Sequence, residues 1–270
     1  MVDKKETKEK VKEQEEKPKQ DMGTKEEIVE NVIEKKPRGK GSFASRGDRK
    51  HQRRAPAEEW IPKTQLGHRV LKGEFASLED LLMKGETILE PEIVETLVPD
   101  LQTEVIYIGG SPGKGGGIRR TATKRTVRVH KSGRRFKLTA VIVVGDGRNI
   151  VGVGKASSRE HRVAIEKATK QAKLNVLRVV KGCGSWECGC DGSHSIPFKT
   201  EVKFGSVTVK LMPAPKGLGI VADKESRKIL GLSGISDVWV KTRGQTGTRT
   251  NLAYAIFEAL KQLNKTKGDL

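Results

Sequence analysis

The feature that most constrains this chain is a central stretch where polar and apolar residues alternate, turn, and alternate again. The stretch is RTVRVHKSGRRFKLTAVIVVGDGRNIVGVGKA, residues 125–156, with turn residues at 131–133 and 145–147. Alternation with a period of two places neighbouring side chains on opposite faces of a strand. Residues 141–144 are all apolar, as in a strand buried on both faces. We therefore predict a three-stranded antiparallel meander built around this buried strand.

A long helix is predicted to follow the meander, from a capping sequence SSRE at 157–160 to about residue 180. Ala164, Ala168 and Ala172 recur at a four-residue spacing, which places them on one helix face. Small residues on that face would let the helix lie close to the sheet. The unit therefore has the order β-β-β-α. Shorter helices are expected before it, one after Ser77 and one from Pro91.

A second unit follows the first. FKTEVKFGSVTVKLMPA, residues 198–214, predicts a hairpin, and a Gly/Pro-rich loop, a helix at 223–232, a strand at 237–242 and a last helix from residue 250 come after it. The predicted fold class is therefore α+β, in two domains. The expected organisation is a disordered charged arm at 1–56, an acidic helical lead-in at 57–104, a first domain at 105–180, a Cys/His-rich connector at 181–196 and a second domain at 197–270.

The charge of the chain indicates a polyanionic partner. The formal net charge is +19, and ten lysines and arginines lie between residues 114 and 137 without one acidic residue. Ordinary soluble surfaces mix both signs, so the imbalance favours nucleic acid or an anionic membrane. No apolar run reaches the roughly 18 residues of a membrane span, so we expect no membrane-spanning segment. We predict RNA contact through Lys114, Arg119, Arg120, Lys124, Arg125, Arg128, His130, Lys131, Arg134, Arg135 and Lys137.

Strand geometry predicts how this basic segment is presented. Arg125, Val127 and Val129 would share one face, and cations such as Arg128 would share the other. We expect the valine face to pack inward and the cationic face to contact phosphates, with residues 131–135 at a projecting tip. Aromatic residues make up only 4% of the chain, so charge rather than base stacking should dominate the RNA contact.

Motifs for nucleotide binding and catalysis are incomplete. The glycine loop GGSPGK at 109–114 is one residue too short for a phosphate-binding P-loop, and GVGKAS at 152–157 lacks the third glycine of a dinucleotide fingerprint. The five histidines are scattered, and none neighbours a serine or cysteine in a nucleophile motif. We therefore expect no catalytic residues and no enzymatic activity.

All three cysteines lie in one short segment, which argues against a secreted disulfide framework and for a reducing cytoplasm. Cys183, Cys188, Cys190 and His194 follow the spacing C-x4-C-x-C-x3-H. Three thiolates and one imidazole are a closed ligand set for one structural zinc ion. Because C-x-C is not the usual C-x2-C knuckle, the alternative that these cysteines are simply buried thiols stays open.

Several sequence blocks carry a family resemblance. GRRFKLTAVIVVGDGRNIVGVGKA, GSVTVKLMPAPKGLGIVA, GLSGISDVWVKTRG and NLAYAIFEAL occur in this order. Together they resemble the family of the fifth protein of the small ribosomal subunit. GCGSWECGC and EEWIPKTQLGHRV resemble its archaeal branch. The resemblance implies a first domain like the double-stranded-RNA-binding fold and a second with a left-handed β-α-β crossover.

The resemblance also implies a function. The protein would be a constituent of the small ribosomal subunit, bind its ribosomal RNA near the messenger entry, contact the fourth and eighth small-subunit proteins, and influence decoding accuracy. Its protein-interface residues would be Pro213, Lys216, Gly217 and Gly219. A free-standing double-stranded-RNA-binding protein or RNA chaperone is the alternative.

Overall fold

The computed structural model describes residues 60–265, apart from residues 114 and 191. The predicted arm at 1–56 therefore lies outside the described residues. The described residues belong to one compact unit. None of the described helices is both long enough and apolar enough to cross a membrane.

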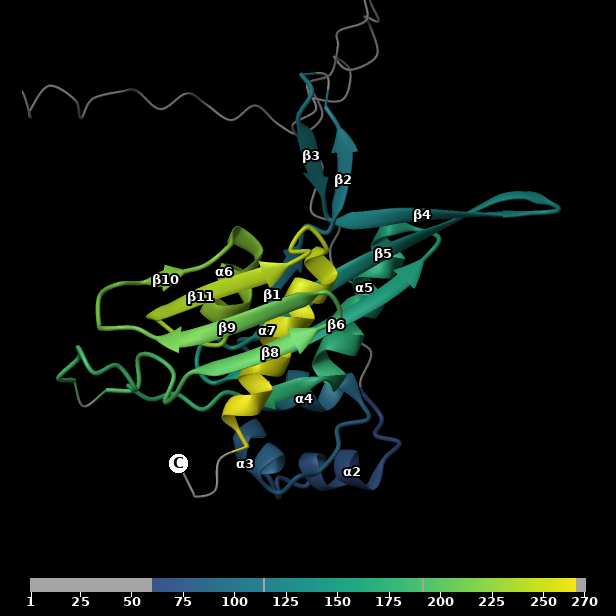
Figure 1. The fold of residues 1–270 in the computed structure, drawn as a ribbon. Helices are drawn as coiled ribbons and strands as arrows, with labels where there is room; N and C mark the ends of the chain where they lie inside the picture. The colour runs from purple at the N-terminus through teal and green to yellow at the C-terminus, as the bar shows by residue number, and fades with distance from the viewer. Residues whose placement is uncertain (1–59, 114, 191, 266–270) are drawn as a thin grey trace, which may run out of the picture. The chain divides into compact units, whose positions relative to one another are not determined.

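Three short helices come first: α2 (Gln65–Leu71), α3 (Leu78–Met83) and α4 (Pro91–Leu97) (Figure 1). The two predicted helix starts are confirmed. The Ser77 side chain accepts a hydrogen bond from the backbone N–H of Asp80 at 3.2 Å, and Pro91 is the first residue of α4. The apolar faces of these helices meet in a buried cluster that includes Leu78, Leu81, Ile93 and Val94.

The predicted meander is confirmed as the centre of a five-stranded sheet. Its antiparallel strands are β4 (Thr123–His130), β5 (Gly133–Gly145) and β6 (Ile150–Ser158). Two further strands were not predicted: β1 (Gln102–Ile106), which pairs with β5, and β7 (Val176–Arg178), which pairs with β6. β4 and β1 pair with successive parts of β5, residues 133–140 and 141–145. The long strand β5 therefore organises the sheet.

The helix after the meander is shorter than predicted. α5 spans His161–Leu174 and does not continue to residue 180, and its N-cap is Glu160, because Ser157 and Ser158 belong to β6. The segment VLRVV at 176–180 is rich in valine, which fits a strand better than a helix. Its first three residues pair with residues 150–152 of β6. Pairing with a sheet edge therefore replaces the last predicted turns of the helix.

Both faces of β5 are covered, as the sequence predicts. Ala140, Ile142 and Val144 form a cluster with the alanine stripe of α5, which confirms the predicted packing. Val141 and Val143 point to the other face and belong to a cluster shared with the C-terminal part of the chain. The sheet thus lies between α5 and the C-terminal elements.

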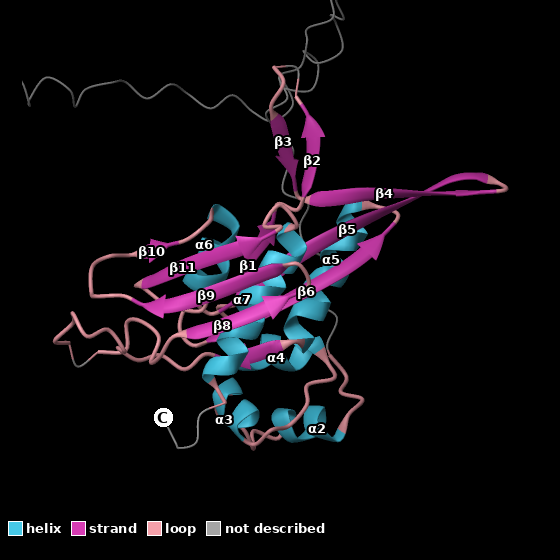
Figure 2. Ribbon diagram, in the orientation of Figure 1, coloured by secondary structure: helices cyan, strands magenta, loops and turns pink. Residues whose placement is uncertain are grey.

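The second unit has the predicted order of elements. It comprises β8 (Thr200–Phe204), β9 (Val207–Pro213), β10 (Ile220–Val221), α6 (Lys224–Leu232), β11 (Val238–Gly244) and α7 (Arg249–Leu263) (Figure 2). The strand order is β10-β11-β9-β8, and β10 runs parallel to β11, to which α6 connects it. α7 packs on β8 and β9. The structure is therefore mixed α+β in both halves.

One apolar core joins the two halves. The cluster that contains Val141 and Val143 also contains residues of α6 and α7, such as Ile229 and Ile256. A buried carboxylate reinforces this junction. Glu225 accepts a hydrogen bond from the backbone N–H of Tyr107 at 3.0 Å and forms ion pairs with Lys228 and Arg249, both at 3.2 Å.

Two glycines of β6 allow the close approach of α5. A Cβ atom at Gly154 would overlap the backbone of Ala168 and Ala172, and one at Gly152 would overlap the backbone of Ala172. Both glycines belong to the GVGKAS segment. Because they lack a Cβ atom, α5 can pack directly against β6 at these positions.

We expect Gly154→Ala to destabilise the protein by about 3 kcal/mol, because the added methyl group forces α5 away from the sheet. Gly231→Ala is the matched control. Its Cβ would meet open space in α6, so alanine should stabilise the fold by roughly 0.5 kcal/mol through helix propensity. Urea unfolding of both variants measures the two effects. Equal stabilities would show that the contact between α5 and β6 is not tight.

Candidate functional site

The basic segment forms a hairpin that extends beyond the sheet. β6 pairs with β5 only from Leu138 onward, whereas β4 pairs with β5 as far as Gly133. Residues 124–137 therefore form a two-stranded ribbon with its turn at the far end, and Figure 1 shows it reaching away from the other strands. The predicted projecting tip is present, and we call this segment the basic hairpin.

The prediction that the valine face packs inward is wrong. Val127, Val129 and Phe136 are all exposed, with Val129 at 76%. The reason is that the hairpin has no third strand or helix layer at this distance from the sheet, so neither face has a core to pack on. The guanidinium of Arg125 lies over the Phe136 ring at 5.2 Å, which partly shields that apolar surface.

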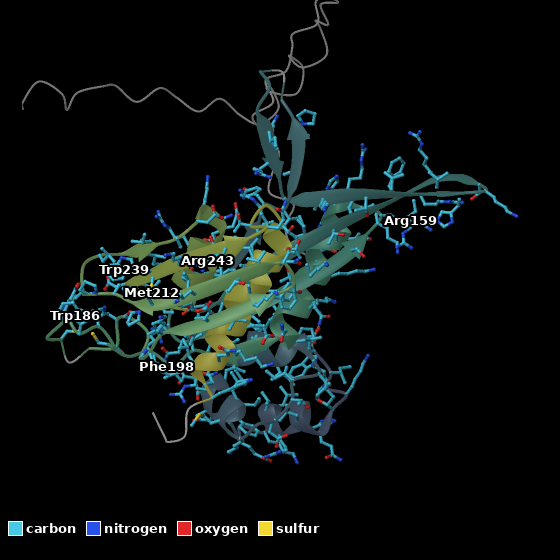
Figure 3. The ribbon with its side chains drawn as sticks, in the orientation of Figure 1. Arg159, Trp186, Phe198, Met212, Trp239 and Arg243 are labelled. Carbon is cyan, nitrogen blue, oxygen red and sulfur yellow. The ribbon has the colours of Figure 1, made fainter. Side chains whose placement is uncertain are left out.

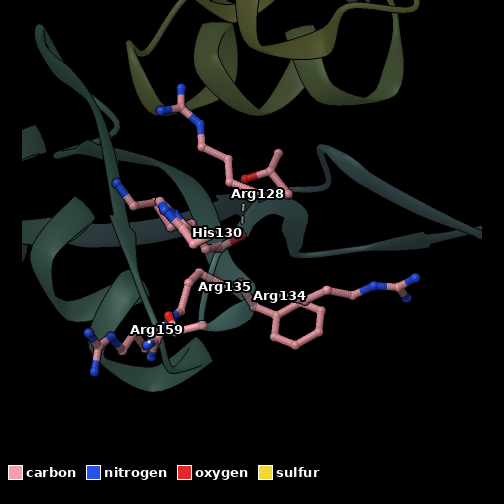
Figure 4. A pocket seen from close by; sticks show the side chains of 9 residues that line it. Arg128, His130, Arg134, Arg135 and Arg159 are labelled. Atoms are coloured by element: carbon pink, nitrogen blue, oxygen red, sulfur yellow. Dashed lines mark hydrogen bonds between the residues drawn. The ribbon is translucent and has the colours of Figure 1, made fainter.

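A hollow of about 680 Å³ lies against the hairpin. Its lining residues come mainly from the two strands and the turn of the hairpin, and none of the described ones is acidic. They are Thr126, Arg128, His130, Ser132, Arg134, Arg135, Phe136, Lys137 and Arg159 (Figure 4). A concave surface with this much positive charge suits phosphate groups. Figure 4 shows Arg128 and Arg134 extending in different directions, so the surface can reach phosphates on more than one side.

Arg159 is a site residue that the sequence analysis missed. It follows β6 and precedes α5, and the fold brings it to the hairpin. A second hollow, of about 420 Å³, shares Lys137 and Arg159 and extends to Lys167 on α5. A basic residue next to the helix cap was the available sequence signal, but only the tertiary structure places it beside the strands.

The predicted RNA-binding residues do not form a single patch. Arg119 and Arg120 lie on a separate hairpin of β2 (Gly109–Pro112) and β3 (Ile118–Thr121). Lys124 and Arg125 lie at the base of the basic hairpin, and Lys131 lies in its turn. Lys114 lies outside the described residues. The structure therefore offers two basic ribbons where the sequence suggested one continuous run.

The structure brings the four predicted metal ligands together. The donor atoms of Cys183, Cys188, Cys190 and His194 all lie within 4.8 Å of one another, so this cluster could hold a metal ion. The sulfur atoms of Cys188 and Cys190 are 3.0 Å apart, and Nε2 of His194 is 2.9 Å from the Cys190 sulfur. A pair of backbone hydrogen bonds between Gly182 and Ser195, both 3.0 Å, closes the loop that carries all four ligands.

Cys188 and Cys190 have different pKa values. The hydrogen bond between their two sulfur atoms, together with the backbone of Lys216, lowers the pKa of Cys188 to about 6. The contact with Cys188 raises the pKa of Cys190 to about 11. The cluster therefore favours a thiolate at Cys188, which is the form that binds metals.

A buried carboxylate connects this cluster to the loop predicted as a protein interface. One oxygen of Asp237 is 2.8 Å from Nδ1 of His194, and the other accepts from the backbone N–H groups of Gly217 at 3.1 Å and Gly219 at 2.7 Å. Both glycines have positive φ angles, 92° and 76°. This left-handed backbone conformation favours glycine, and in it both residues direct their N–H groups at Asp237.

Comparisons with known proteins identify the family. The model of the ribosomal protein S5 N-terminal domain matches residues 120–180, and that of the S5 C-terminal domain matches residues 202–270. The small ribosomal subunit protein uS5 of Methanocaldococcus jannaschii is 47% identical over 210 residues, which cover 78% of this chain and 90% of the relative. The chain belongs to the ribosomal protein S5 family.

Two further uS5 relatives are similar in the same way. Those of Nanoarchaeum equitans and Methanothermobacter thermautotrophicus are 44% and 42% identical over 212 and 211 residues, which cover 78% of this chain and 90% and 91% of the relatives. The chain is thus of the archaeal S5 type, as the sequence blocks indicate. S5 proteins are ribosomal proteins and not enzymes, in agreement with the absence of catalytic motifs in the sequence. The Cys/His cluster lies between the two matched S5 segments.

We expect Asp237→Ala to destabilise this S5 protein by about 3 kcal/mol, because it leaves three N–H groups without their charged acceptor. Hydrogen exchange should become faster at residues 217 and 219. Asp223→Ala removes a carboxylate that caps α6 and should cost only about 1 kcal/mol, with exchange at 217 and 219 unchanged. Unfolding and exchange measurements on both variants test this role. An unchanged exchange rate at Gly219 in Asp237→Ala would contradict it.

Proposed function

We propose that this protein is a structural constituent of the small ribosomal subunit and that it binds ribosomal RNA through the basic hairpin. Family membership supports the first part, since the relatives are named small ribosomal subunit proteins. The observation that carries the second part is the acid-free hollow lined by Arg128, Arg134, Arg135 and Arg159. The protein performs no reaction in this role; it neutralises phosphates and fixes the path of RNA.

The physical basis of binding is counterion release. Each lysine or arginine that pairs with a phosphate frees a condensed cation, so binding weakens steeply as salt rises. Because both faces of the hairpin are exposed, it can lie between two RNA segments and contact each. Exposed Val129 and Phe136 add apolar surface for sugars or unstacked bases.

Finer parts of the proposal rest on the family resemblance. We propose that the protein helps shape the messenger entry region, contacts the fourth and eighth small-subunit proteins, and affects decoding accuracy through the loop of Pro213, Lys216, Gly217 and Gly219. The rigid attachment of this loop to Asp237 supports a role as a contact surface. We also propose the domain division at 105–180 and 197–270, a double-stranded-RNA-binding-like first domain and a left-handed β10-α6-β11 crossover.

The alternative is a free-standing RNA-binding protein or RNA chaperone. Sucrose-gradient sedimentation of a lysate separates the two. A subunit constituent sediments with the small subunit, whereas a free-standing protein stays near the top of the gradient.

Replacing Lys131, Arg134 and Arg135 with alanine should reduce the slope of log affinity against log salt by about 2 to 3 for a duplex RNA. The full chain is measured by fluorescence anisotropy over a range of salt concentrations. The matched control replaces three exposed helix cations, Lys224, Arg227 and Lys261, with alanine. A hairpin variant with the wild-type slope would remove the hairpin from the RNA interface.

We also propose that the Cys/His cluster holds one structural zinc ion. A zinc–sulfur bond of about 2.3 Å requires donors about 3 to 4 Å apart, which the contacts of Cys188, Cys190 and His194 approach. The hydrogen bond from His194 to Asp237 is the kind of outer contact that orients a metal-bound histidine. When bound, the ion would supply a rigid cross-link and no chemistry, since four protein ligands leave no open position.

Elemental analysis of the purified protein should give about one zinc per chain, with little left in Cys188→Ser. Asp237→Asn keeps the shape of the side chain but weakens its hold on His194, so zinc affinity should fall by roughly 10- to 100-fold. His130→Ala, which removes an imidazole outside the cluster, should retain its zinc. Purified protein that contains no metal and has three freely titrating thiols would contradict the zinc proposal. The alternative that these cysteines are simply buried thiols would then hold.

A further inference from the structure

The C-terminal sheet has a second face that none of the sites above uses. On one face, Val202, Val209, Leu211 and other buried residues share the core with α7. Side chains that alternate with them are half-buried or exposed and point the other way. We call this the outer sheet face. Its residues are Lys199, which precedes β8, Glu201 and Lys203 of β8, Thr208, Lys210 and Met212 of β9, and Trp239, Lys241 and Arg243 of β11.

The outer sheet face carries an excess of positive charge. It has five lysines and arginines and one acid, Glu201, which pairs with Lys210 at 3.2 Å. Lys241 lies directly opposite Lys210 in the sheet. Like charges in directly opposed positions destabilise a sheet. The contact with the Lys210 ammonium, and its charge, lower the pKa of Lys199. A bound anion would relieve the repulsion between these ammonium groups.

The same face has an apolar end with an aromatic ring. Trp239 lies opposite Met212, and Figure 3 shows both on the sheet together with Arg243. A hollow of about 150 Å³ lies on this face, and its lining residues are Lys199, Glu201, Thr208, Lys210, Met212, Lys241 and Arg243. The hollow thus brings Lys199, which precedes β8, together with cations of β9 and β11 beside Met212.

We propose that the outer sheet face binds a single-stranded RNA segment, with its phosphates on Lys210, Lys241 and Arg243 and a base against Trp239. Cations that follow a backbone, combined with an aromatic ring for stacking, are the two components of single-strand binding surfaces. An open four-stranded sheet is also a known platform for unstacked bases. This inference rests on the proposed RNA-binding function and adds a second contact with a different form of RNA.

An acidic protein segment would form ion pairs with the cations of the outer sheet face, but it would not require an aromatic ring for stacking. The partly exposed Trp239 therefore favours RNA over a protein partner. The basic hairpin is a two-stranded ribbon that projects from its sheet, whereas the outer sheet face is an open surface of a four-stranded sheet. The two surfaces should consequently differ in whether they prefer paired or unpaired RNA.

The test uses the full chain with two probes, a single-stranded RNA of about twelve nucleotides and a duplex of the same length. Lys241→Gln with Arg243→Gln should weaken single-strand binding about tenfold and reduce its salt slope by about 1.4. The matched control is Lys224→Gln with Arg227→Gln on α6, which makes the same change in charge away from the face. It should change single-strand binding less than twofold.

Trp239→Ala tests the stacking contact, with an expected loss of about tenfold in single-strand affinity. Trp186→Ala is its control, because Trp186 is 92% exposed and lies on the loop of the Cys/His cluster. It should bind the single strand as the wild type does. Circular dichroism and thermal unfolding of each variant confirm that the sheet is intact.

The outcomes separate this inference from the proposed function. Wild-type single-strand affinity in both sheet-face variants, with duplex binding still weakened by the hairpin variant, would overturn the inference and leave the hairpin in place. Weakened single-strand binding in the sheet-face variants would support it even if the hairpin variant behaved as wild type. A crosslink from Lys241 to a protein in isolated small subunits, with RNA affinity unchanged, would assign the face to a protein partner and overturn it.

Discussion

The burial of β5 on both faces is the constraint on which the rest of the structure depends. Its residues 140–144 contact α5 on one side and the core shared with α6 and α7 on the other. This double coverage removes five consecutive apolar side chains from water and fixes the strand between two layers. The outer half of the same strand is the second arm of the basic hairpin. A buried core strand therefore continues into a charged ribbon in solvent, where its valines are exposed and no acidic residue lines the hollow beside its cations.

Charge separation follows from this arrangement. Acidic residues such as Glu225 and Asp237 are buried, each satisfied by several donors, and they hold elements together. The cations of the hairpin and of the outer sheet face remain without such partners among the residues that line their hollows, apart from Glu201. Folding thus uses these carboxylates for internal cross-links and leaves positive charge exposed on two surfaces, as the proposed RNA-binding function requires.

Asp237 connects two features that look unrelated in the sequence. It follows α6, the first helix of its unit, far along the chain from the cysteines, yet one oxygen contacts His194 and the other accepts hydrogen bonds from Gly217 and Gly219. Through Asp237, the Cys/His cluster and the proposed contact loop form one polar network.

The sequence by itself determined the elements whose signals are local: the alternating meander, the alanine stripe of α5, the caps at Ser77 and Pro91, the order of the second unit and the four clustered ligands at 183–194. Tertiary structure decided what depends on distant partners. Val127 and Val129 alternate like core residues, but the sheet layers end before they are reached. Residues 176–178 are predicted as the end of a helix, but they form a strand that pairs with the edge of β6. Arg159 and Asp237 become site residues only because the chain folds back on itself, and a periodic pattern carries no information about which segments meet across a core.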